Sequence, residues 1–492
     1  MPPTADKSAA PTVEYFLEDA RVKACLQLLD DKFRKDGNNS LVVSDVLDKH
    51  GHQYVNLVQK GGGVLGIALA GYTYVLEYMG IRFLRLAGTS AGAINTALIA
   101  VIGNKEEPKS KKVLEYMCGL KFFSLVDGHP TARWIIKHFI TDKHFSARIQ
   151  KWLIGIVAVL ALLLVSDFIF LGLQAKFEHP WSKITRISFV LTGFFLLFIA
   201  IIVVYFATLM KRLKESGYGI NPGDFFYTWI KDRLHDNGIT TVSSLIKKAE
   251  EVPEFQLRPG VKHPEGLSGL KGDVTFITSE VVTQNKVQFP KMCHLFRHPN
   301  EINELQPAGF IRASMAIPIF FESYYINDIP CKTDEMKKAW TDEFNESDPP
   351  QTARFVDGGI LSNFPVDIFY RPEISIPRMP VFGIDLDDTE PRDQKKHAVN
   401  WSLFGYFGRL FNTVRFYYDK DFLLKNKMFN RGIGKVPLPP SQFNWLNFFV
   451  EKPEMKDMFI IGVEQATKFL IDFDWKEYKK DRKQFHHQLL NR

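Results

Sequence analysis

A serine flanked by small residues is the clearest candidate nucleophile in the sequence. It lies in Gly88-Thr89-Ser90-Ala91-Gly92, a G-x-S-x-G pentapeptide between an expected strand at residues 81–87 and an expected helix at residues 93–102. A tight strand-to-helix turn exposes such a serine, and small neighbours avoid clashes at the bend. Because short Gly/Ser/Ala strings also occur in ordinary loops, the pentapeptide alone leaves both a catalytic turn and a plain turn open.

A second glycine-rich turn precedes it, with Gly61, Gly63 and Gly66 in the spacing G-x-G-x-x-G. It connects an expected buried strand at residues 54–58 to an apolar helical pattern, so its free backbone amides suit an anion. A dinucleotide site would need an acidic residue near the end of the next strand, and residues 81–87 end without one. The spacing therefore does not predict a dinucleotide cofactor.

The two turns together indicate a different anion. They follow adjacent expected strands, 29 residues apart (61 to 90). In a parallel β-α-β unit both turns emerge at the carboxyl edge of the sheet. There the amides of Gly62 and Gly63 can face the ester carbonyl that Ser90 attacks and stabilise the oxyanion. The anion is then transient, an intermediate of acyl transfer.

A base for Ser90 is expected at Asp357. This residue ends an expected strand at residues 353–356 and is followed by Gly358 and Gly359. An acid before glycines can be a plain turn former, but in the same sheet as Ser90 it can take the hydroxyl proton directly. Of the 13 histidines none has an obvious catalytic setting, and His397 lies in a charged string typical of a solvated segment.

The three motifs GGGVLG, GTSAG and DGG, in this order and setting, resemble the patatin-like phospholipases. The similarity extends to residues 308–323 and 380–388, and covers roughly residues 52–140 and 270–390. The resemblance implies a three-layer α/β fold with a mainly parallel central sheet, and a Ser–Asp dyad that cleaves acyl esters. It makes Ser90 the nucleophile, Asp357 the general base, and Gly61, Gly62, Gly63 and Ala91 the oxyanion hole, with motif glycines at Gly66, Gly88, Gly92, Gly358 and Gly359.

One position departs from that family. Members often carry Arg or Lys at the fifth position of the glycine-rich motif, where this chain has Leu65. The substitution removes a cation that would help to hold an anionic head group. It bears on substrate choice more than on the chemistry of hydrolysis.

Two apolar segments predict a transmembrane hairpin within the chain, at residues 152–173 and 188–210. The average composition is that of a globular protein, but each segment as a helix spans roughly 33 Å, enough for a hydrocarbon core of about 30 Å. A buried hairpin in a soluble core is the alternative. In lipid, Asp167 must face the partner helix or water. The 14-residue stretch between the segments, residues 174–187, is expected to be the connecting loop.

The hairpin constrains topology. Ser90 precedes both segments and Asp357 follows them, so an even number of spans is needed to bring the two residues to one side. The outer flanks are slightly richer in Lys and Arg than the connecting loop, which favours a cytoplasmic catalytic domain in a multi-pass membrane protein. The four cysteines (Cys25, Cys118, Cys293 and Cys331) have neither zinc nor disulfide spacing and agree with a reducing compartment.

The sequence divides into four parts. We expect a helical N-terminal extension at residues 1–50 with the first 12 residues disordered, a catalytic domain at residues 51–400, the hairpin inserted at residues 152–210, and a helical C-terminal region at residues 401–492. Within the last part, residues 404–422 are aromatic and basic, which suits either a core helix with a solvated face or a membrane-surface helix.

The net charge of +7 suits an anionic membrane surface, and no motif that reads nucleic acid is present. No cluster of metal ligands occurs and the dyad is self-sufficient, so neither a metal nor another cofactor is expected. The leading hypothesis is a membrane-anchored hydrolase of acyl lipids. The alternatives are a catalytically inactive membrane protein that binds lipid or a partner, and a serine esterase with a histidine triad that uses His397, His486 or His487. Head group, acyl length and protein partners stay open.

Overall fold

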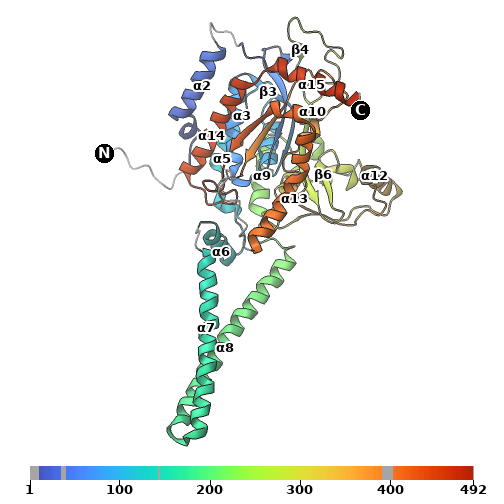
Figure 1. Cartoon of the computed structure of the whole chain (residues 1–492). Helices are drawn as coiled ribbons and strands as arrows, with labels where there is room; N and C mark the ends of the chain where they lie inside the picture. Colours follow the sequence, from blue (N-terminus) through green and yellow to red (C-terminus); the bar gives the residue numbers. More distant parts are fainter. Residues whose placement is uncertain (1–9, 35–39, 142–144, 390–402, 491–492) are drawn as a thin grey trace. The chain divides into compact units, whose positions relative to one another are not determined.

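The computed structural model describes residues 10–34, 40–141, 145–389 and 403–490. The chain divides into two compact units (Figure 1). The larger unit comprises Met1–Asp127 and Gly223–Arg492, and the smaller unit comprises Gly128–Pro222. The residues expected to form the N-terminal extension, most of the catalytic domain and the C-terminal region thus belong to one unit, and the expected hairpin lies inside the other.

A mostly parallel sheet forms the centre of the larger unit, with the strand order β10-β9-β2-β3-β5-β8-β7. Five neighbouring strands are parallel: β10 (Ile433–Pro437), β9 (Val381–Asp387), β2 (Gln53–Gln59), β3 (Ile81–Thr89) and β5 (Asp273–Glu280). The remaining strands pair antiparallel: β8 (Ala353–Asp357), β7 (Tyr324–Ile326), β6 (Asn285–Phe289), β1 (Val46–Asp48) and β4 (Phe255–Leu257). This arrangement confirms the predicted α/β fold class.

Helices cover both faces of this sheet (Figure 1). Every residue of β2 and all but one of β3 are buried. Because successive strand residues point to opposite faces, strands buried along their whole length must be covered on both sides. Their apolar runs therefore lack the alternation of a half-exposed strand, which is the pattern that the sequence shows at residues 54–58 and 81–87.

Two of the helices that cover the sheet pack closely together: α3 (Ile67–Tyr78) and α14 (Lys452–Asp472). Their backbones approach so closely that a Cβ atom at Gly71 would lie 2.1 Å from the carbonyl oxygen of Phe459. On another part of the sheet, Val58, Ala87 and Val381 form a core cluster with η8 (Lys427–Gly432) and with side chains of α13 (Leu403–Lys425) and α15 (Trp475–Leu490). The C-terminal region is thus an integral part of the catalytic fold.

The other helices of the larger unit surround this core: α1 (Val13–Leu17), α2 (Ala20–Phe33), α4 (Ala91–Val101), α5 (Ser110–Gly119), α9 (Asp224–Asp236), α10 (Val242–Glu250), α11 (Pro307–Ser314) and α12 (Asp334–Phe344). The helices predicted before residue 50 are α1 and α2, and α2 packs against α14. The predicted disorder of residues 1–12 falls mostly on residues outside the described ranges.

The smaller unit consists of three helices, α6 (Pro130–Thr141), α7 (Phe145–Lys176) and α8 (Glu178–Glu215), in its described part. Two candidate spans within it, Gln150–Lys176 and Trp181–Glu215, are long and apolar enough to cross a membrane by length and composition. The predicted loop at residues 174–187 is wrong, because only Phe177 separates α7 from α8. Each apolar segment is instead the middle of a longer helix.

Polar residues of the smaller unit lie in the seam between α7 and α8. Asp167 is 6% exposed and accepts a hydrogen bond from the Ser188 hydroxyl. The Thr185 hydroxyl donates to the carbonyl oxygen of Phe170 across the same seam, at 3.2 Å. The expectation that Asp167 faces the partner helix is therefore confirmed, and the outward surfaces of both helices are left to apolar side chains.

Candidate active site

Ser90 stands on a strained turn between β3 and α4. Its backbone has φ 54° and ψ −123°, a conformation that a residue with a side chain rarely adopts. Two contacts hold it: the Ser90 amide donates to Oγ of Ser314 at 3.0 Å, and α4 approaches β2 so closely that a Cβ atom at Gly92 would lie 2.3 Å from the carbonyl oxygen of Gln59. Such strain, paid for by the surrounding packing, presents the hydroxyl at the end of the strand.

Asp357 reaches Ser90 from an antiparallel strand. β8 runs opposite to β5 and places Asp357 opposite Thr278, while the neighbouring residue Ile277 pairs with Thr89 at the end of β3. The carboxylate accepts a hydrogen bond from the Gly359 amide at 2.7 Å, and the Ser90 side chain lies beside it, close enough to lower its pKa. Ser90 and Asp357 are each 4% exposed. The two sequence-predicted residues are therefore brought into direct contact.

The surroundings adjust the basicity of this carboxylate. Burial raises the pKa of Asp357, and the neighbouring Ser90 side chain, the charge of Arg415 and the Gly359 amide oppose that rise without cancelling it. A carboxylate whose pKa is raised is a stronger proton acceptor than an exposed one, which suits a general base. The site thus combines a buried carboxylate of raised pKa with a nearby cation that offsets part of the effect of burial.

The glycine-rich turn lies beside the nucleophile. A Cβ atom at Gly61 would lie 2.9 Å from Cβ of Ser90, so only glycine fits there. The Gly61 amide already donates to the carbonyl oxygen of Asn363 at 3.0 Å and is not free for a substrate. In the described part of the chain the amides of Gly62, Gly63 and Ala91 have no acceptor. Of the four predicted oxyanion donors, Gly62, Gly63 and Ala91 therefore stay candidates. The amide of Gly61 is already used, and this glycine allows close packing against Ser90.

The loop after Asp357 is fixed by residues that the sequence did not single out. Asn363 joins this loop to the glycine-rich turn, because its side-chain amide donates to the Gly61 carbonyl at 3.2 Å. Asp419 of α13 accepts three hydrogen bonds, from the Asn363 and Phe364 amides at 2.7 Å each and from the Ser362 hydroxyl at 2.8 Å. One buried carboxylate therefore holds the loop that carries the base.

A cation also reaches this loop from α13. Arg415 donates through Nε to the Gly359 carbonyl at 2.8 Å, and its guanidinium lies 5.7 Å from the centre of the Trp445 ring. Trp445 in turn accepts the Val64 amide, which fixes the glycine-rich turn. The Leu65 side chain is 1% exposed and packs in the core.

An apolar cavity of about 50 Å³ borders the oxyanion donors. Gly63 and Ala91 belong to its lining. Other walls come from α4, α5, α9, the segment after α11 and the segment before α14, among them Leu98, Met117, Trp229, Ile317 and Phe448. A narrow apolar cavity beside a serine and an oxyanion site is suited to an acyl chain. The sequence did not predict it, because its walls come from segments far apart in the chain.

Other predicted features can be placed as well. His397 lies outside the described residues, and Nδ1 of His486 is 2.9 Å from the carbonyl oxygen of Pro372. The four cysteines are free thiols, and burial raises the pKa of Cys118 to about 11. In the described ranges no group of three or more His, Cys, Asp and Glu side chains is placed to hold a metal ion.

A mostly parallel sheet with a serine at a strand-to-helix turn and a carboxylate in contact with it defines an α/β acyl hydrolase. The family model of the patatin-like phospholipases matches residues 57–370, well over half of the chain, and this chain belongs to that family. A lipid acyl hydrolase is therefore the general class of its activity. Asp419 and Arg415 lie beyond the matched residues.

The chain is also similar to two individual proteins. It is 26% identical over 366 residues to the uncharacterized protein YqhO of Bacillus subtilis (strain 168), an alignment that covers 74% of this chain and 82% of that protein. The crystal structure of VipD from Legionella pneumophila covers 90% of this chain and 72% of that chain, with 14% identity and a TM-score of 0.34. That structural likeness is too low to support an argument about the site.

Proposed function

We propose that this protein is a membrane-anchored lipid acyl hydrolase that cleaves ester bonds through an acyl-enzyme on Ser90, with Asp357 as the general base. The observation that carries the proposal is the placement of the Ser90 side chain beside a buried Asp357 carboxylate, close to three backbone amides without acceptors in the described chain. A nucleophile, a base and an oxyanion site in one place are the parts that acyl transfer needs.

The first half of the reaction forms the acyl-enzyme. As Oγ of Ser90 attacks the ester carbonyl carbon, its proton passes to Asp357 and the carbonyl oxygen becomes an oxyanion facing the amides of Gly62, Gly63 and Ala91. Collapse of this intermediate breaks the bond to the alcohol part of the lipid. The leaving oxygen takes the proton from Asp357, and the acyl chain stays on Ser90 in the apolar cavity.

The second half releases the fatty acid. Water attacks the acyl carbon and gives a proton to Asp357, while the same amides hold the new oxyanion. The bond to Oγ then breaks, Ser90 recovers the proton from Asp357, and the free acid leaves. One carboxylate serves as base and then as acid in each half, so this scheme requires neither a histidine nor a metal ion.

Membrane anchoring rests on the smaller unit. In the most apolar windows of its two candidate spans only 6% and 11% of the residues are buried. A core helix of a soluble protein would bury most of such a window, and a signal sequence would lie at the N-terminus, whereas these helices lie in the middle of the chain. Large side chains such as Leu162, Phe168 and Phe194 point outward. These observations support a two-span hairpin, and the charge bias of its flanks supports a cytoplasmic catalytic unit.

A second element supports contact with lipid. Helix α13, which corresponds to the predicted aromatic and basic segment at residues 404–422, exposes an apolar stripe at helical spacing. The stripe consists of Tyr406, Leu410, Val414 and Tyr417. The same helix supplies Arg415 and Asp419 to the catalytic loop, so its surface and the site are joined by a single rigid element.

The two alternatives are less well supported. An inactive lipid-binding protein had Leu65 as its main sequence support, but Leu65 is a buried core residue and does not disturb the dyad. A histidine triad needs an imidazole near Ser90, and the described partner of the Ser90 hydroxyl is a carboxylate. A labelling experiment distinguishes both alternatives from the proposal.

Labelling with a fluorophosphonate serine probe tests the proposal. We expect the full-length protein in detergent to be labelled at the Ser90 peptide, and Ser90→Ala to be unlabelled. Asp357→Asn should slow labelling strongly, while His486→Ala and His487→Ala should leave it within a fewfold. Absence of labelling in the folded wild-type protein, with a control hydrolase labelled in the same sample, would favour the inactive lipid-binding protein. Loss of labelling in a histidine variant would favour the triad.

A further inference from the structure

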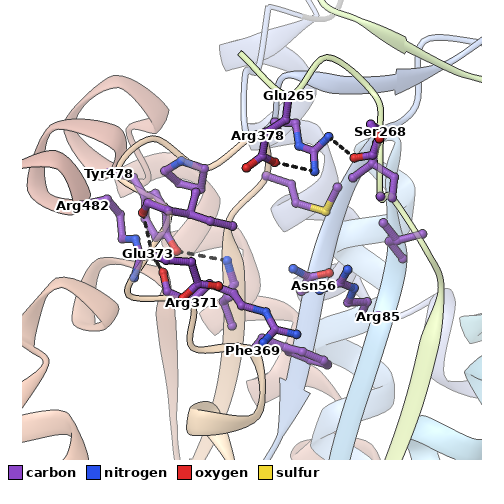
Figure 2. A pocket seen from close by; sticks show the side chains of 17 residues that line it. Asn56, Arg85, Glu265, Ser268, Phe369, Arg371, Glu373, Arg378, Tyr478 and Arg482 are labelled. Atoms are coloured by element: carbon purple, nitrogen blue, oxygen red, sulfur yellow. Dashed lines mark hydrogen bonds and ion pairs between the residues drawn. The ribbon is translucent and has the colours of Figure 1, made fainter. Parts of the chain in front are cut away.

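A second cavity lies at the opposite edge of the sheet from Ser90. It has a volume of about 480 Å³ and belongs wholly to the larger unit (Figure 2). Val381, the first residue of β9, lines it, as does Arg85, which pairs with Asp273, the first residue of β5. Ser90 and the oxyanion amides follow the carboxyl ends of their strands. The two sites thus lie toward opposite ends of the strands, and none of the residues that line this cavity belongs to the dyad or the oxyanion site.

Arginine dominates the charge of this cavity. Its lining includes four arginines, Arg85, Arg371, Arg378 and Arg482, against two glutamates, Glu265 and Glu373, which leaves a net charge of +2 (4 − 2). Figure 2 shows these side chains around one space, with Arg378 paired to Glu265 at 3.1 Å.

Two of these guanidinium groups are weakly neutralised. The Arg371 side chain forms no ion pair in the described part of the chain, and Nε of Arg85 has the Lys271 carbonyl oxygen as its acceptor, at 3.1 Å. Burial and the positive charges of Arg371 and Arg378 lower the pKa of Arg85, with Asp273 acting in the other direction. Like charges gathered around a cavity repel each other unless an anion lies between them.

Buried polar groups in the same lining lack partners. Asn56 of β2 is 9% exposed, and its side-chain oxygen forms no hydrogen bond. Arg482 of α15 is 6% exposed, and its Nε has no acceptor, although another of its nitrogens donates to the Arg371 carbonyl at 2.8 Å. Buried polar groups in proteins are nearly always paired, and exceptions cluster where a ligand binds. The amide and the guanidinium are both labelled in the lining in Figure 2.

The rest of the lining is apolar or aromatic. Leu84, Leu270, Phe369, Pro377, Met379 and Tyr478 contribute to it. The Tyr478 hydroxyl already accepts the Val381 amide at 3.1 Å, so this ring offers mainly a flat surface. A ligand for this cavity therefore needs a doubly charged anionic group for the arginines and a compact organic part for these walls.

We propose that this cavity binds a small organic phosphate monoester, with the phosphate held by Arg85, Arg371 and Arg482 and the organic part beside Asn56 and the apolar walls. A phosphate dianion matches the net charge of the lining, and guanidinium forks bind phosphate oxygens in pairs. The organic part comes either from a nucleoside or from a lipid head group. The site is remote from the dyad and stands whether or not Ser90 is catalytic.

Binding of three probes to the full-length protein in detergent tests this proposal by calorimetry. The probes are inorganic phosphate, glycerol 3-phosphate and AMP, and we expect one saturable site for the two monoesters with weaker binding of inorganic phosphate. Tighter binding of AMP would identify a nucleoside ligand and tighter binding of glycerol 3-phosphate a head group; either result supports the site. Absence of binding, or equal affinity for all three probes, would overturn the proposal.

Substitutions locate the binding. Arg371→Gln and Arg85→Gln should weaken binding of the preferred monoester at least tenfold, because each removes a cation that forms few interactions within the protein. Arg21→Gln is the matched control: it removes the same charge from α2, where Arg21 is half exposed and pairs with Asp457. Affinity unchanged in Arg371→Gln and Arg85→Gln, or lowered equally in Arg21→Gln, would contradict the assigned site.

Asn56→Leu separates binding from folding. Leucine has a similar size and leaves no buried amide without a partner, so the Tm of the variant should equal or exceed that of the wild type. Its affinity for the monoester should fall at least fivefold. A higher Tm together with unchanged affinity would remove the amide from the proposed site, and a lower Tm would show that the amide serves the fold.

Discussion

Helix α4 and the helices α7 and α8 are all strongly apolar, yet their surroundings are opposite. Ten of the 11 residues of α4 are buried between the sheet and neighbouring helices, whereas 6% and 11% of the most apolar windows of α7 and α8 are buried. Composition alone does not distinguish these helices. The extent of burial does distinguish them, because apolar side chains that the protein does not cover are favoured only in an apolar environment outside it.

Polar residues follow the same rule in both regions. In α4, the Thr96 hydroxyl accepts the Gln59 side-chain amide at 2.9 Å, on the side that faces β2. In the smaller unit, Asp167 and Thr185 point into the seam between α7 and α8. In each region these polar groups find partners inside the protein, but only the larger unit also buries its apolar helix. In the proposed function the larger unit carries out the chemistry and the smaller unit anchors it in lipid, and the following predictions separate these two roles.

The largest effect is expected from Ser90→Ala. Hydrolysis of both soluble and bilayer esters should fall by about 10³-fold or more, because the variant has no oxygen to form the acyl-enzyme. Flotation with phospholipid vesicles should be unchanged, since the hairpin is intact. A variant that keeps its activity would show that another residue is the nucleophile. A variant that no longer floats with the vesicles would show that Ser90 also affects membrane binding, which the comparison treats as separate from catalysis.

A smaller loss is expected when the support of the catalytic loop is removed. Asp419→Ala leaves the Asn363 and Phe364 amides and the Ser362 hydroxyl without their acceptor. Displacement of the loop by about 1 Å is enough to lower kcat by about 10²-fold. Assays of kcat should be paired with Asp421→Ala, a carboxylate of the same helix that pairs with Lys425 instead. Similar kcat values in the two variants would deny Asp419 a positioning role.

The charge of Arg415 should act on pH dependence. This cation lowers the pKa of Asp357, so Arg415→Gln raises that pKa further. Since Asp357 must be ionised to accept a proton, the acidic limb of the kcat/KM profile should move to higher pH. Arg415→Lys keeps a positive charge and should move the limb less. If kcat falls in Arg415→Gln but the limb stays in place, Arg415 acts on the loop and not on the base.

The smallest effect concerns the seam of the hairpin. A double-mutant cycle of Asp167→Leu and Ser188→Ala, measured by thermal unfolding in detergent, should give a coupling of about 0.6 kcal/mol, typical of hydrogen bonds between membrane helices. Hydrolysis of a soluble ester should stay within twofold in all members of the cycle. A coupling of zero would mean that the two side chains do not meet in the hairpin.

Sequence patterns predicted the strands and the motif turns of this protein better than the residues that hold the catalytic loop in place. The strands at residues 54–58 and 81–87 were recognisable because parallel strands covered on both faces are continuous apolar runs. The serine turn and the acidic turn were recognisable because their glycines stand at short, fixed spacings. The structure brings Ser90 and Asp357 together across 267 residues (90 to 357), which the sequence indicated through the position of Asp357 at a strand end and through the family resemblance.

Other features were invisible in the sequence. Asp419 lies among aromatic and basic residues of α13, and nothing in that local pattern points to a loop 55 residues earlier (419 to 364). The error at residues 174–187 has a similar origin. The loop was predicted because these residues separate two apolar segments. Pro180 falls instead in the first turn of α8, where proline is tolerated, and the Thr185 hydroxyl bonds to the partner helix.

Deletion of the hairpin tests the central claim most directly. A soluble esterase has to withdraw a lipid chain from the bilayer against about 0.8 kcal/mol per CH₂, whereas an anchored one meets the ester at the surface. The variant lacking residues 150–212, bridged by a flexible linker, is compared with the full chain on p-nitrophenyl butyrate and on phosphatidylcholine vesicles. We expect butyrate hydrolysis within a fewfold of the full chain and vesicle hydrolysis reduced by about 10²-fold or more. Equal loss on both substrates in a folded variant would make the two helices part of the catalytic core, and equal retention would move the membrane contact to another surface such as the apolar stripe of α13.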